Sequence, residues 1–295
     1  MAEENNKKDK SVLWTIICIV LFLYAFSLFI PMLWSFISSF KTSIDFTLNP
    51  FGMPKKWIFG NYKTILDFFY IKTNGAGGQR EVYIPEMLLY SVLYALGSAL
   101  IQSFVQFITA YAASRFDFKI GKIIYVLVIL AMVVPIVGSD ASALTIANFL
   151  GLKDTIIGMW IMKAYFLGMY FLVFYEMLRA FPKDYSEAAY LDGANNFTVM
   201  FRVMAPLCAT TFFTVVLLLF VQYWNDYTTP MLFMPNLPTL SYGLYYFNMH
   251  NTITEVNTTP MKLGACMMML VPTLVVFVAF HNKLLNNVTI GGVKE

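Results

Sequence analysis

Between two long apolar segments the chain reads Glu187-Ala188-Ala189-Tyr190-Leu191-Asp192-Gly193-Ala194, and Pro206-Leu207 follows twelve positions later. Asp184 stands in an N-cap position and Glu187 comes three residues after it, which is the arrangement of a capping box. Gly193 stands where that helix should stop, because glycine readily adopts the left-handed conformation after a helix. The stretch therefore predicts a short helix followed by a tight turn.

A second helix is expected directly after the turn. Ala188 and Ala189 favour the first helix and add little bulk, so another surface can approach its backbone. In the second helix one stripe holds four apolar side chains, and Pro206 is expected to end it: Phe197, Met200, Phe201 and Met204. Local signals alone allow two interpretations, a docking element or an ordinary cytoplasmic linker.

The composition of the 295-residue chain indicates a membrane protein. Hydrophobic residues make up 59% and charged residues 13%, whereas soluble domains have about 45–50% and about 25%. The net charge of +3 is too small to indicate nucleic-acid binding. The three cysteines lie within apolar runs, so we interpret them as core residues and not as a disulfide framework or metal site: Cys18, Cys208 and Cys266.

Six segments are expected to cross the bilayer as helices, since lipid leaves no partner for unpaired backbone groups. The third is the shortest, and the first is too long for a signal-peptide core and is expected to be retained. Prolines inside three of them, Pro31, Pro135 and Pro272, are expected to kink the helices. The predicted spans are 12–37, 87–113, 123–137, 156–180, 207–228 and 263–285.

The distribution of basic residues predicts that both termini are cytoplasmic. Basic residues gather at the N-terminus, after the second span and after the fourth, and six spans place all three groups on one face. The long segment 38–86 also carries basic residues, but acidic residues partly neutralise them and long loops weigh less. The basic residues on the expected cytoplasmic face are Lys7, Lys8, Lys10, Arg115, Lys119, Lys122, Arg179, Lys183 and Arg202.

The motif around Glu187 resembles the "EAA" loop of ABC-importer permeases, and Asp192-Gly193-Ala194 resembles its form in the maltose-type carbohydrate branch. The resemblance implies that segment 182–207 is a coupling helix that docks on a separate ATPase subunit. It also implies an all-α type I importer permease with six transmembrane helices. The residues implied to couple to the ATPase are Glu187, Ala188, Ala189, Asp192 and Gly193.

Further stretches extend the resemblance over about residues 87 to 295. They are Ala110–Lys122, Gly151–Thr155, Trp224-Asn225-Asp226 with Pro230, and Gly291-Gly292-Val293-Lys294. We therefore expect residues 1–86 to form an N-terminal tail, the first span and an extracellular loop, and residues 87–295 to form the permease core.

Sequence motifs for ATP binding or enzymatic catalysis are missing. The chain has no G-x-x-x-x-G-K-[ST] phosphate loop, no H-E-x-x-H and no G-x-S-x-G, and its only histidines are His250 and His281. We expect no catalytic residue, metal or cofactor in this chain, and we expect ATP and Mg²⁺ to be bound by the partner ATPase.

Polar residues within the spans are candidates for a translocation path, because they are costly to bury unless they face protein or water. In the second span Ser98, Gln102 and Gln106 share one helix face. The same residue types also make hydrogen bonds between helices, which is the alternative interpretation. Lys163 is left out because it can extend to the interface. The candidates are Gln102, Gln106, Gln222, Asn225 and Asp226.

Two outer segments carry features of an ordered surface. Segment 38–86 combines an amphipathic piece, Asn61–Tyr70, with a glycine-rich turn, Gly75–Gly78. In segment 236–261 the aromatic residues form either an interfacial belt or a docking surface.

The sequence thus predicts a multi-pass permease subunit in a bacterial cytoplasmic membrane that imports a sugar or oligosaccharide. The resemblance implies three partners besides lipid and sugar: a second homologous permease, an ATPase dimer and an extracellular solute-binding protein. The alternatives are a permease for another solute, an ion-coupled transporter and an integral-membrane enzyme. An ion-coupled carrier needs no ATPase-docking loop, and no pair of reactive groups shares one membrane depth.

Overall fold

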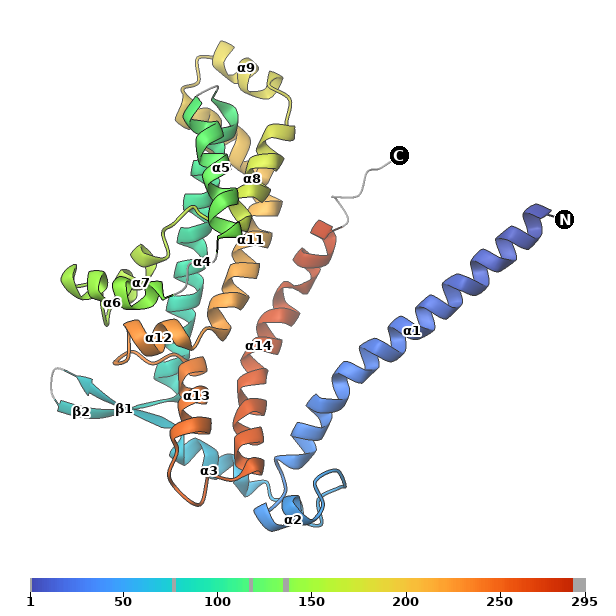
Figure 1. Ribbon diagram of the computed structural model, residues 1–295, viewed down its shortest axis with the longest axis vertical. Coiled ribbons are helices and arrows are strands. Elements are labelled where there is room, and N and C mark those ends of the chain that lie inside the picture. The colour runs from blue at the N-terminus through green and yellow to red at the C-terminus, as the bar shows by residue number, and fades with distance from the viewer. Residues whose placement is uncertain (1, 76–77, 117–118, 135–137, 289–295) are drawn as a thin grey trace. The chain divides into compact units, whose positions relative to one another are not determined.

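The computed structural model describes residues 2–75, 78–116, 119–134 and 138–288, and it is mainly helical (Figure 1). The chain divides into two compact units. The smaller comprises residues 1–69 and 247–273, and the larger comprises residues 70–246 and 274–295. Pro135, the tip of the glycine-rich turn and the Gly291–Lys294 ending lie outside the described residues.

The smaller unit holds α1 (Ala2–Ser38), α2 (Ser43–Leu48), α3 (Gly60–Phe68) and the first part of α14 (Thr259–Val288). Lys41 is buried just after α1, and its ammonium donates to the carbonyls of Asn49 at 2.7 Å and Pro50 at 3.2 Å. The indole of Trp34 donates to the same Pro50 carbonyl at 2.9 Å. These bonds fasten the proline-rich segment against the end of α1.

The larger unit begins with a hairpin and continues as a helical bundle. Its elements are β1 (Tyr70–Gly75), β2 (Gly78–Tyr83), α4 (Ile84–Arg115), α5 (Lys119–Val133), α6 (Ser139–Phe149), α7 (Ile156–Met162), α8 (Met169–Ala180), α9 (Asp184–Leu191), α10 (Asn196–Thr198), the π-helix η1 (Val199–Met204), α11 (Ala205–Asn225), α12 (Thr228–Phe233) and α13 (Leu240–His250). Helix α13 continues into the smaller unit after Tyr246, and the part of α14 from Leu274 onward belongs to the larger unit.

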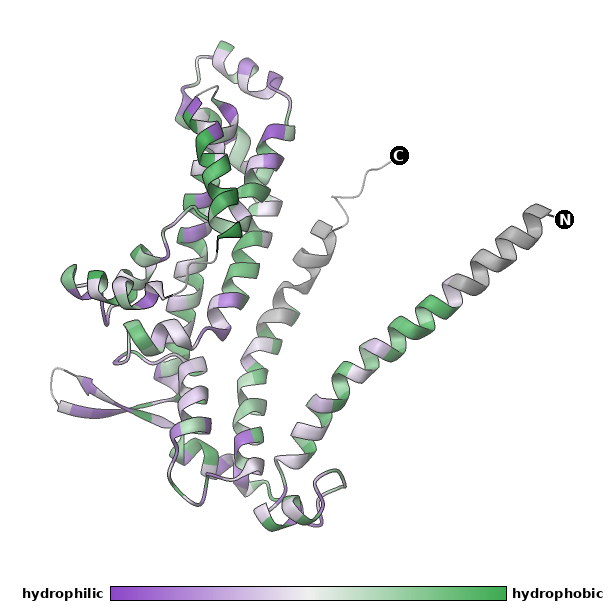
Figure 2. Ribbon diagram, viewed as in Figure 1, coloured by the Kyte–Doolittle hydropathy of each residue, from purple (hydrophilic) through white to green (hydrophobic). Residues whose placement is uncertain are grey.

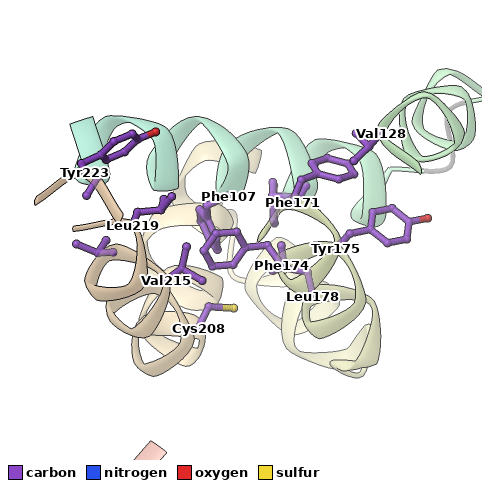
Figure 3. Packing of buried hydrophobic residues seen from close by; sticks show 14 of the residues in the cluster. Phe107, Val128, Phe171, Phe174, Tyr175, Leu178, Cys208, Val215, Leu219 and Tyr223 are labelled. Atoms are coloured by element: carbon purple, nitrogen blue, oxygen red, sulfur yellow. The ribbon is translucent and has the colours of Figure 1, made fainter. Parts of the chain in front are cut away.

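The core of the larger unit is built around α4, which packs against α11, α8, α7 and α5. Phe107 of α4 lies between α8 and α11 and points toward Phe174 (Figure 3). It meets Phe174 and Phe212 edge to face, with ring centroids 5.6 and 6.0 Å apart. Alanines along α4, among them Ala99 and Ala110, are fully buried and let the neighbouring helices approach closely.

Three helices of the described chain are long and apolar enough to cross a membrane: Trp14–Ser38, Ile84–Arg115 and Asn196–Asn225. They contain most of the predicted first, second and fifth spans. Apolar residues also dominate α5, which carries most of the third, and α14 contains the sixth (Figure 2). The α1 span buries none of its hydrophobic window within the chain.

The prediction of one continuous fourth span, 156–180, is wrong. The helix stops at Met162, and α8 starts at Met169 after Gly168, whose φ is +147°. Only glycine adopts that conformation readily, so the backbone turns there even though the run is apolar throughout. Hydropathy reports composition and does not detect such a break.

The all-α prediction also needs correction, because β1 and β2 form an antiparallel hairpin in the expected outer loop. The register pairs Tyr70 with Tyr83 and Lys72 with Glu81. Gly75 and Gly78, the two ends of the glycine-rich stretch, form the last pair of this register. Within the expected amphipathic piece at 61–70, residues up to Phe68 lie in helix α3, with Asn61 and Ile65 on its buried face, and Tyr70 begins β1.

Candidate functional site

The helix-turn-helix around Glu187 is confirmed, but its N-terminus differs from the expectation. The predicted Asp184 cap is wrong: helix α9 begins at Asp184, and the residue before it, Lys183, makes no side-chain capping bond. The Lys183 carbonyl instead accepts from the backbone N–H groups of Ser186 at 2.9 Å and Glu187 at 3.0 Å. Asp184 and Glu187 both lie in the first turn, where negative charge interacts favourably with the helix dipole.

The C-terminus of α9 agrees with the prediction. Gly193 has a φ of +83°, and its N–H donates to the Tyr190 carbonyl at 3.0 Å. The next N–H, of Ala194, reaches back to the Ala189 carbonyl, also at 3.0 Å. This pair of bonds is a complete Schellman motif, and it fixes the direction in which the chain leaves the helix.

Beyond the turn a new helix starts at once. The Asn195 side chain caps it by accepting from the Thr198 N–H at 2.8 Å, and the Tyr190 hydroxyl donates to Asn196 Oδ1 at 2.9 Å. The predicted stop at Pro206 is wrong, because η1 continues into α11 and the helical run extends from Asn196 to Asn225. Pro206 is the second residue of α11 and directly follows the π-helical segment η1.

Four of the five predicted coupling residues are exposed, namely Glu187, Ala188, Asp192 and Gly193. The fifth, Ala189, is half-buried and packs against the core of the unit. Two large apolar side chains beside them are uncovered: Leu191 is 90% exposed and Phe197 is 72% exposed. Helix α9 therefore presents a mixed apolar and acidic surface at one end of the bundle (Figure 1).

Side chains of α4 pack against η1, the helical segment that follows the Gly193 turn. Arg115 Nη2 lies 3.4 Å from the sulfur of Met204 in η1. The Phe104 and Phe201 rings are stacked with centroids 6.2 Å apart. These contacts join η1 directly to α4, the central helix of the larger unit.

Four of the five predicted path residues separate into two groups. Gln102 and Gln106 are buried within the helix packing, whereas Gln222 and Asn225 are exposed on α11. The Tyr223 hydroxyl donates to Gln102 Oε1, which is the hydrogen bond between helices that the alternative interpretation describes. Asn225 Nδ2 donates to the Val221 carbonyl of its own helix at 2.8 Å.

Gln106 lies beside the break in the fourth span. It is fully buried, and neither amide atom has a hydrogen-bond partner among the described residues. A Cβ atom on Gly168 would stand 3.3 Å from Gln106 Nε2. The irregular segment 163–168 therefore approaches a polar group inside the bundle, as non-helical backbone at membrane depth generally does.

Asp226 lies just after α11 in a group that we call the polar junction, formed by Tyr94, Lys163, Tyr223, Asp226 and Thr229. The Asp226 carboxylate accepts from the Tyr94 hydroxyl at 2.9 Å and from the Thr229 N–H at 3.0 Å. Lys163 Nζ lies 3.3 Å from Thr229 Oγ1 and 5.0 Å from the centre of the Tyr223 ring. Sequence reasoning left Lys163 out. Lys163 is the C-cap of α7, and Gly168, which precedes α8, is the residue whose type could have indicated a break in this segment.

A second cluster, the Asn236 node, joins three segments of the larger unit. The Asn236 side chain accepts from the Asn74 N–H of β1 at 2.9 Å and donates to Asp154 Oδ2 at 3.2 Å. Its backbone N–H donates to Asp154 Oδ1 at 2.9 Å, and the Asp154 N–H donates to the Phe233 carbonyl at 2.8 Å. Asp154 itself has a φ of +59°. The node fixes the predicted turn Gly151–Thr155 to the hairpin.

Comparison with known proteins identifies a family. Residues 106–283 match the family described as "Binding-protein-dependent transport system inner membrane component". The diacetylchitobiose uptake system permease protein NgcG of Streptomyces coelicolor is 25% identical over 95% of this chain and 85% of its own length. The probable starch degradation products transport system permease protein AmyC of Thermoanaerobacterium thermosulfurigenes is 24% identical over 88% of this chain and 89% of its own.

A solved structure has a similar fold. It is described as a bacterial ABC transporter involved in the import of the acidic polysaccharide alginate. The matched chain has a TM-score of 0.72 and 18% sequence identity, and the match covers 92% of this chain and 96% of that chain. The chain therefore shares the fold of that matched chain.

Proposed function

This chain belongs to the family of binding-protein-dependent transport system inner membrane components, and from that premise we propose that it is one permease subunit of an ATP-driven importer for a sugar or oligosaccharide. The names of the diacetylchitobiose and starch-product permeases support a carbohydrate substrate. The importer operates in a bacterial cytoplasmic membrane, which the chain crosses six times with both termini in the cytoplasm.

The exposed helix α9 is the observation that carries this proposal. Its Schellman turn at Gly193, together with the contact between Arg115 of α4 and Met204 of the following η1, holds an apolar and acidic surface ready for a partner. That partner is the ATPase dimer, which binds ATP and Mg²⁺. When the dimer closes on ATP, it displaces α9, and η1 and α11 carry the displacement into the bundle.

The remaining partners are a second homologous permease and an extracellular solute-binding protein that delivers the sugar. Gln222 and Asn225 are exposed on α11, so they are the candidates for lining a path between the two permeases. Polar side chains on a membrane helix avoid lipid, which favours this placement. Gln102, Gln106 and Asp226 support the path from within the subunit. Residues 87–295 form the permease core and residues 1–86 form the N-terminal region.

The proposal is tested by reconstituting the chain with its second permease, ATPase and binding protein in proteoliposomes. Uptake of a labelled oligosaccharide should require the binding protein outside and ATP with Mg²⁺ on the ATPase side. Uptake without ATP that follows an imposed proton or sodium gradient would show an ion-coupled carrier instead. ATP-dependent uptake of an amino acid, with none of any oligosaccharide, would keep the family and reject the substrate class.

A further inference from the structure

The helix after the Gly193 turn does not bury the stripe that α-helical spacing predicts. Of the four apolar residues expected on one face, Met200 is 5% exposed and Met204 is fully buried. Phe197 is instead 72% exposed and Phe201 is 44% exposed, while Val199, which lies outside the predicted stripe, is fully buried. Residues seven positions apart share one face of an α-helix, so Phe197 would lie beside Met204 in a regular helix. The backbone between them therefore turns differently.

The π-helical segment η1 accounts for this pattern of burial. At its end the Ala205 N–H donates to the Met200 carbonyl, five residues back, whereas an α-helix bonds four residues back. Such a turn holds about one residue more than an α-helical turn, so the residues before η1 are rotated by roughly 100° relative to α11. This rotation turns Phe197 away from Met204 and brings Val199 toward it.

Pro206 explains why the wide turn lies at this place. In a continuous α-helix its ring would clash with the carbonyl of the residue four positions earlier, which is Arg202 in η1. A helical run that passes through Pro206 therefore departs from α-helical geometry in the turn before it. The segment η1 is that departure.

The rotation at η1 carries the whole helix-turn-helix with it. The Tyr190 hydroxyl donates to Asn196 Oδ1 at 2.9 Å, so α9 is bonded to the start of the following helix. The Asn195 side chain accepts from the Thr198 N–H at 2.8 Å, and Thr198 directly precedes η1. The direction in which α9 and Phe197 face is thus set by the register of η1.

The exposed side chains of this helix-turn-helix suit a soluble protein partner. Leu191 and Phe197 are large, apolar and uncovered, and the same element exposes the carboxylates of Asp184, Glu187 and Asp192. Carboxylates are costly to place among acyl chains and are repelled by anionic lipid headgroups, so neither part of a bilayer fits. Aromatic side chains, by contrast, are enriched in the buried centre of protein interfaces.

We propose that Pro206 is a positioning residue, which through η1 fixes the rotational register of the helix-turn-helix, and that Phe197 is the aromatic anchor which this register presents to the ATPase. The inference rests on the proposed function, which supplies the ATPase as the soluble partner of α9. Register and anchor are separate roles, so they predict different defects in different variants.

The register is read from the reactivity of single cysteines. The full-length chain is studied with its second permease in nanodiscs, before the ATPase is added and in a background without the native cysteines. Phe197→Cys should react with a hydrophilic thiol reagent about tenfold faster than Val199→Cys, because thiol reactivity follows exposure. Adding Pro206→Ala permits a regular α-helix, so it should abolish or reverse this difference. An unchanged ratio of rates after Pro206→Ala would overturn the register role.

A one-residue deletion separates register from general stability. Arg202 is exposed within η1, and its removal lets an α-helical turn replace the wide turn while the residues on both sides keep their facing. Pro206→Ala should raise the Kd for the ATPase about tenfold, and deletion of Arg202 from that variant should return the Kd to within about threefold of wild type. Adding Arg202→Ala instead removes the charge but not the residue, and this matched control should not restore binding. Failure of the deletion to restore binding in an intact permease pair would also overturn the register role.

The anchor is tested with Phe197→Ala and the ATPase that supports uptake by the wild-type complex. The variant should raise the Kd for the ATPase about tenfold, as loss of an interface anchor does. Ile120→Ala removes a side chain of α5 that is 66% exposed, and this control should leave the Kd unchanged. Wild-type affinity in Phe197→Ala would overturn the anchor role and leave the proposed function in place. A wild-type permease pair that neither binds an ATPase nor imports sugar would overturn the proposed function and this inference with it.

Discussion

The indole ring of Trp160 lies directly against the backbone of Gly97, so closely that a Cβ atom on residue 97 would stand 2.2 Å from ring atoms Cε2 and Nε1. The same Nε1 donates to the Leu93 carbonyl at 3.0 Å. This contact packs α7 closely against α4, just before the non-helical segment that interrupts the predicted fourth span. The absence of a side chain at Gly97 is thus a requirement of packing and not of backbone conformation.

Gly97→Ala should therefore destabilise the subunit by about 1–3 kcal/mol, the usual cost of overpacking. Thermal unfolding of the detergent-purified complex measures the loss. Gly60→Ala is the control, because a Cβ there meets no atom closer than 4.0 Å. Adding Trp160→Leu to Gly97→Ala should recover part of the stability, and a double variant as unstable as the sum of both changes would contradict the packing argument.

Gly193→Val tests whether the segment around Glu187 couples this subunit to an ATPase. The variant should still insert into the membrane, but it should assemble less well with the ATPase. Nothing lies within 4 Å of a Cβ at this position, so any effect must come from the φ of +83°. Forcing a β-branched residue into that region costs about 1–2 kcal/mol. We expect normal membrane insertion but reduced ATPase binding and sugar uptake. Gly193→Asn should be milder, and full uptake by Gly193→Val would contradict the coupling role.

Gln102 and Tyr223 allow the two interpretations of the polar residues to be compared. If their hydrogen bond joins α4 to α11, Gln102→Leu and Tyr223→Phe should each lower stability, and a double-mutant cycle should give a coupling of about 0.6–2 kcal/mol. If Gln102 lines the path, uptake should fall while stability is unchanged. Both quantities are measured on the same purified variants.

The orientation of the chain can be tested with single cysteines in a background lacking Cys18, Cys208 and Cys266. A cysteine at Glu81 should react with a membrane-impermeant thiol reagent in intact cells. Cysteines at Tyr190 and Lys119 should react with this reagent only after the membrane has been permeabilised. Labelling of Tyr190→Cys from outside would reject both the cytoplasmic position of α9 and its docking on an ATPase.

The sequence predicted those features that depend on one residue type or on composition. Gly193 was recognisable because few residues other than glycine accept its φ, and the long spans were recognisable because lipid demands apolar residues. The prediction that Asp184 caps α9 was wrong because Lys183 already has helical dihedrals. Asp184 is therefore the first residue of the helix, whereas a capping residue stands just before it. Local sequence does not reveal that choice.

Other features depended on distant contacts. The hairpin needs Asn236, which lies 162 residues from Asn74. The inward direction of Lys163 needs Thr229 and Tyr223, which come from elements far along the chain. The candidate path residues were found by type, but only packing decided that Gln102 and Gln106 lie inside the subunit.

The uninterrupted run from Asn196 to Asn225 makes the docking end and the membrane span a single rod. Its 30 residues correspond to about 45 Å at 1.5 Å per residue. The π-helical segment η1 and Pro206 lie near the N-terminal end of this run, which is where a helix bends most easily. The Asp226 carboxylate, held by Tyr94, anchors the other end, so a displacement at the Gly193 turn is expected to bend the rod near η1 and not near Asp226.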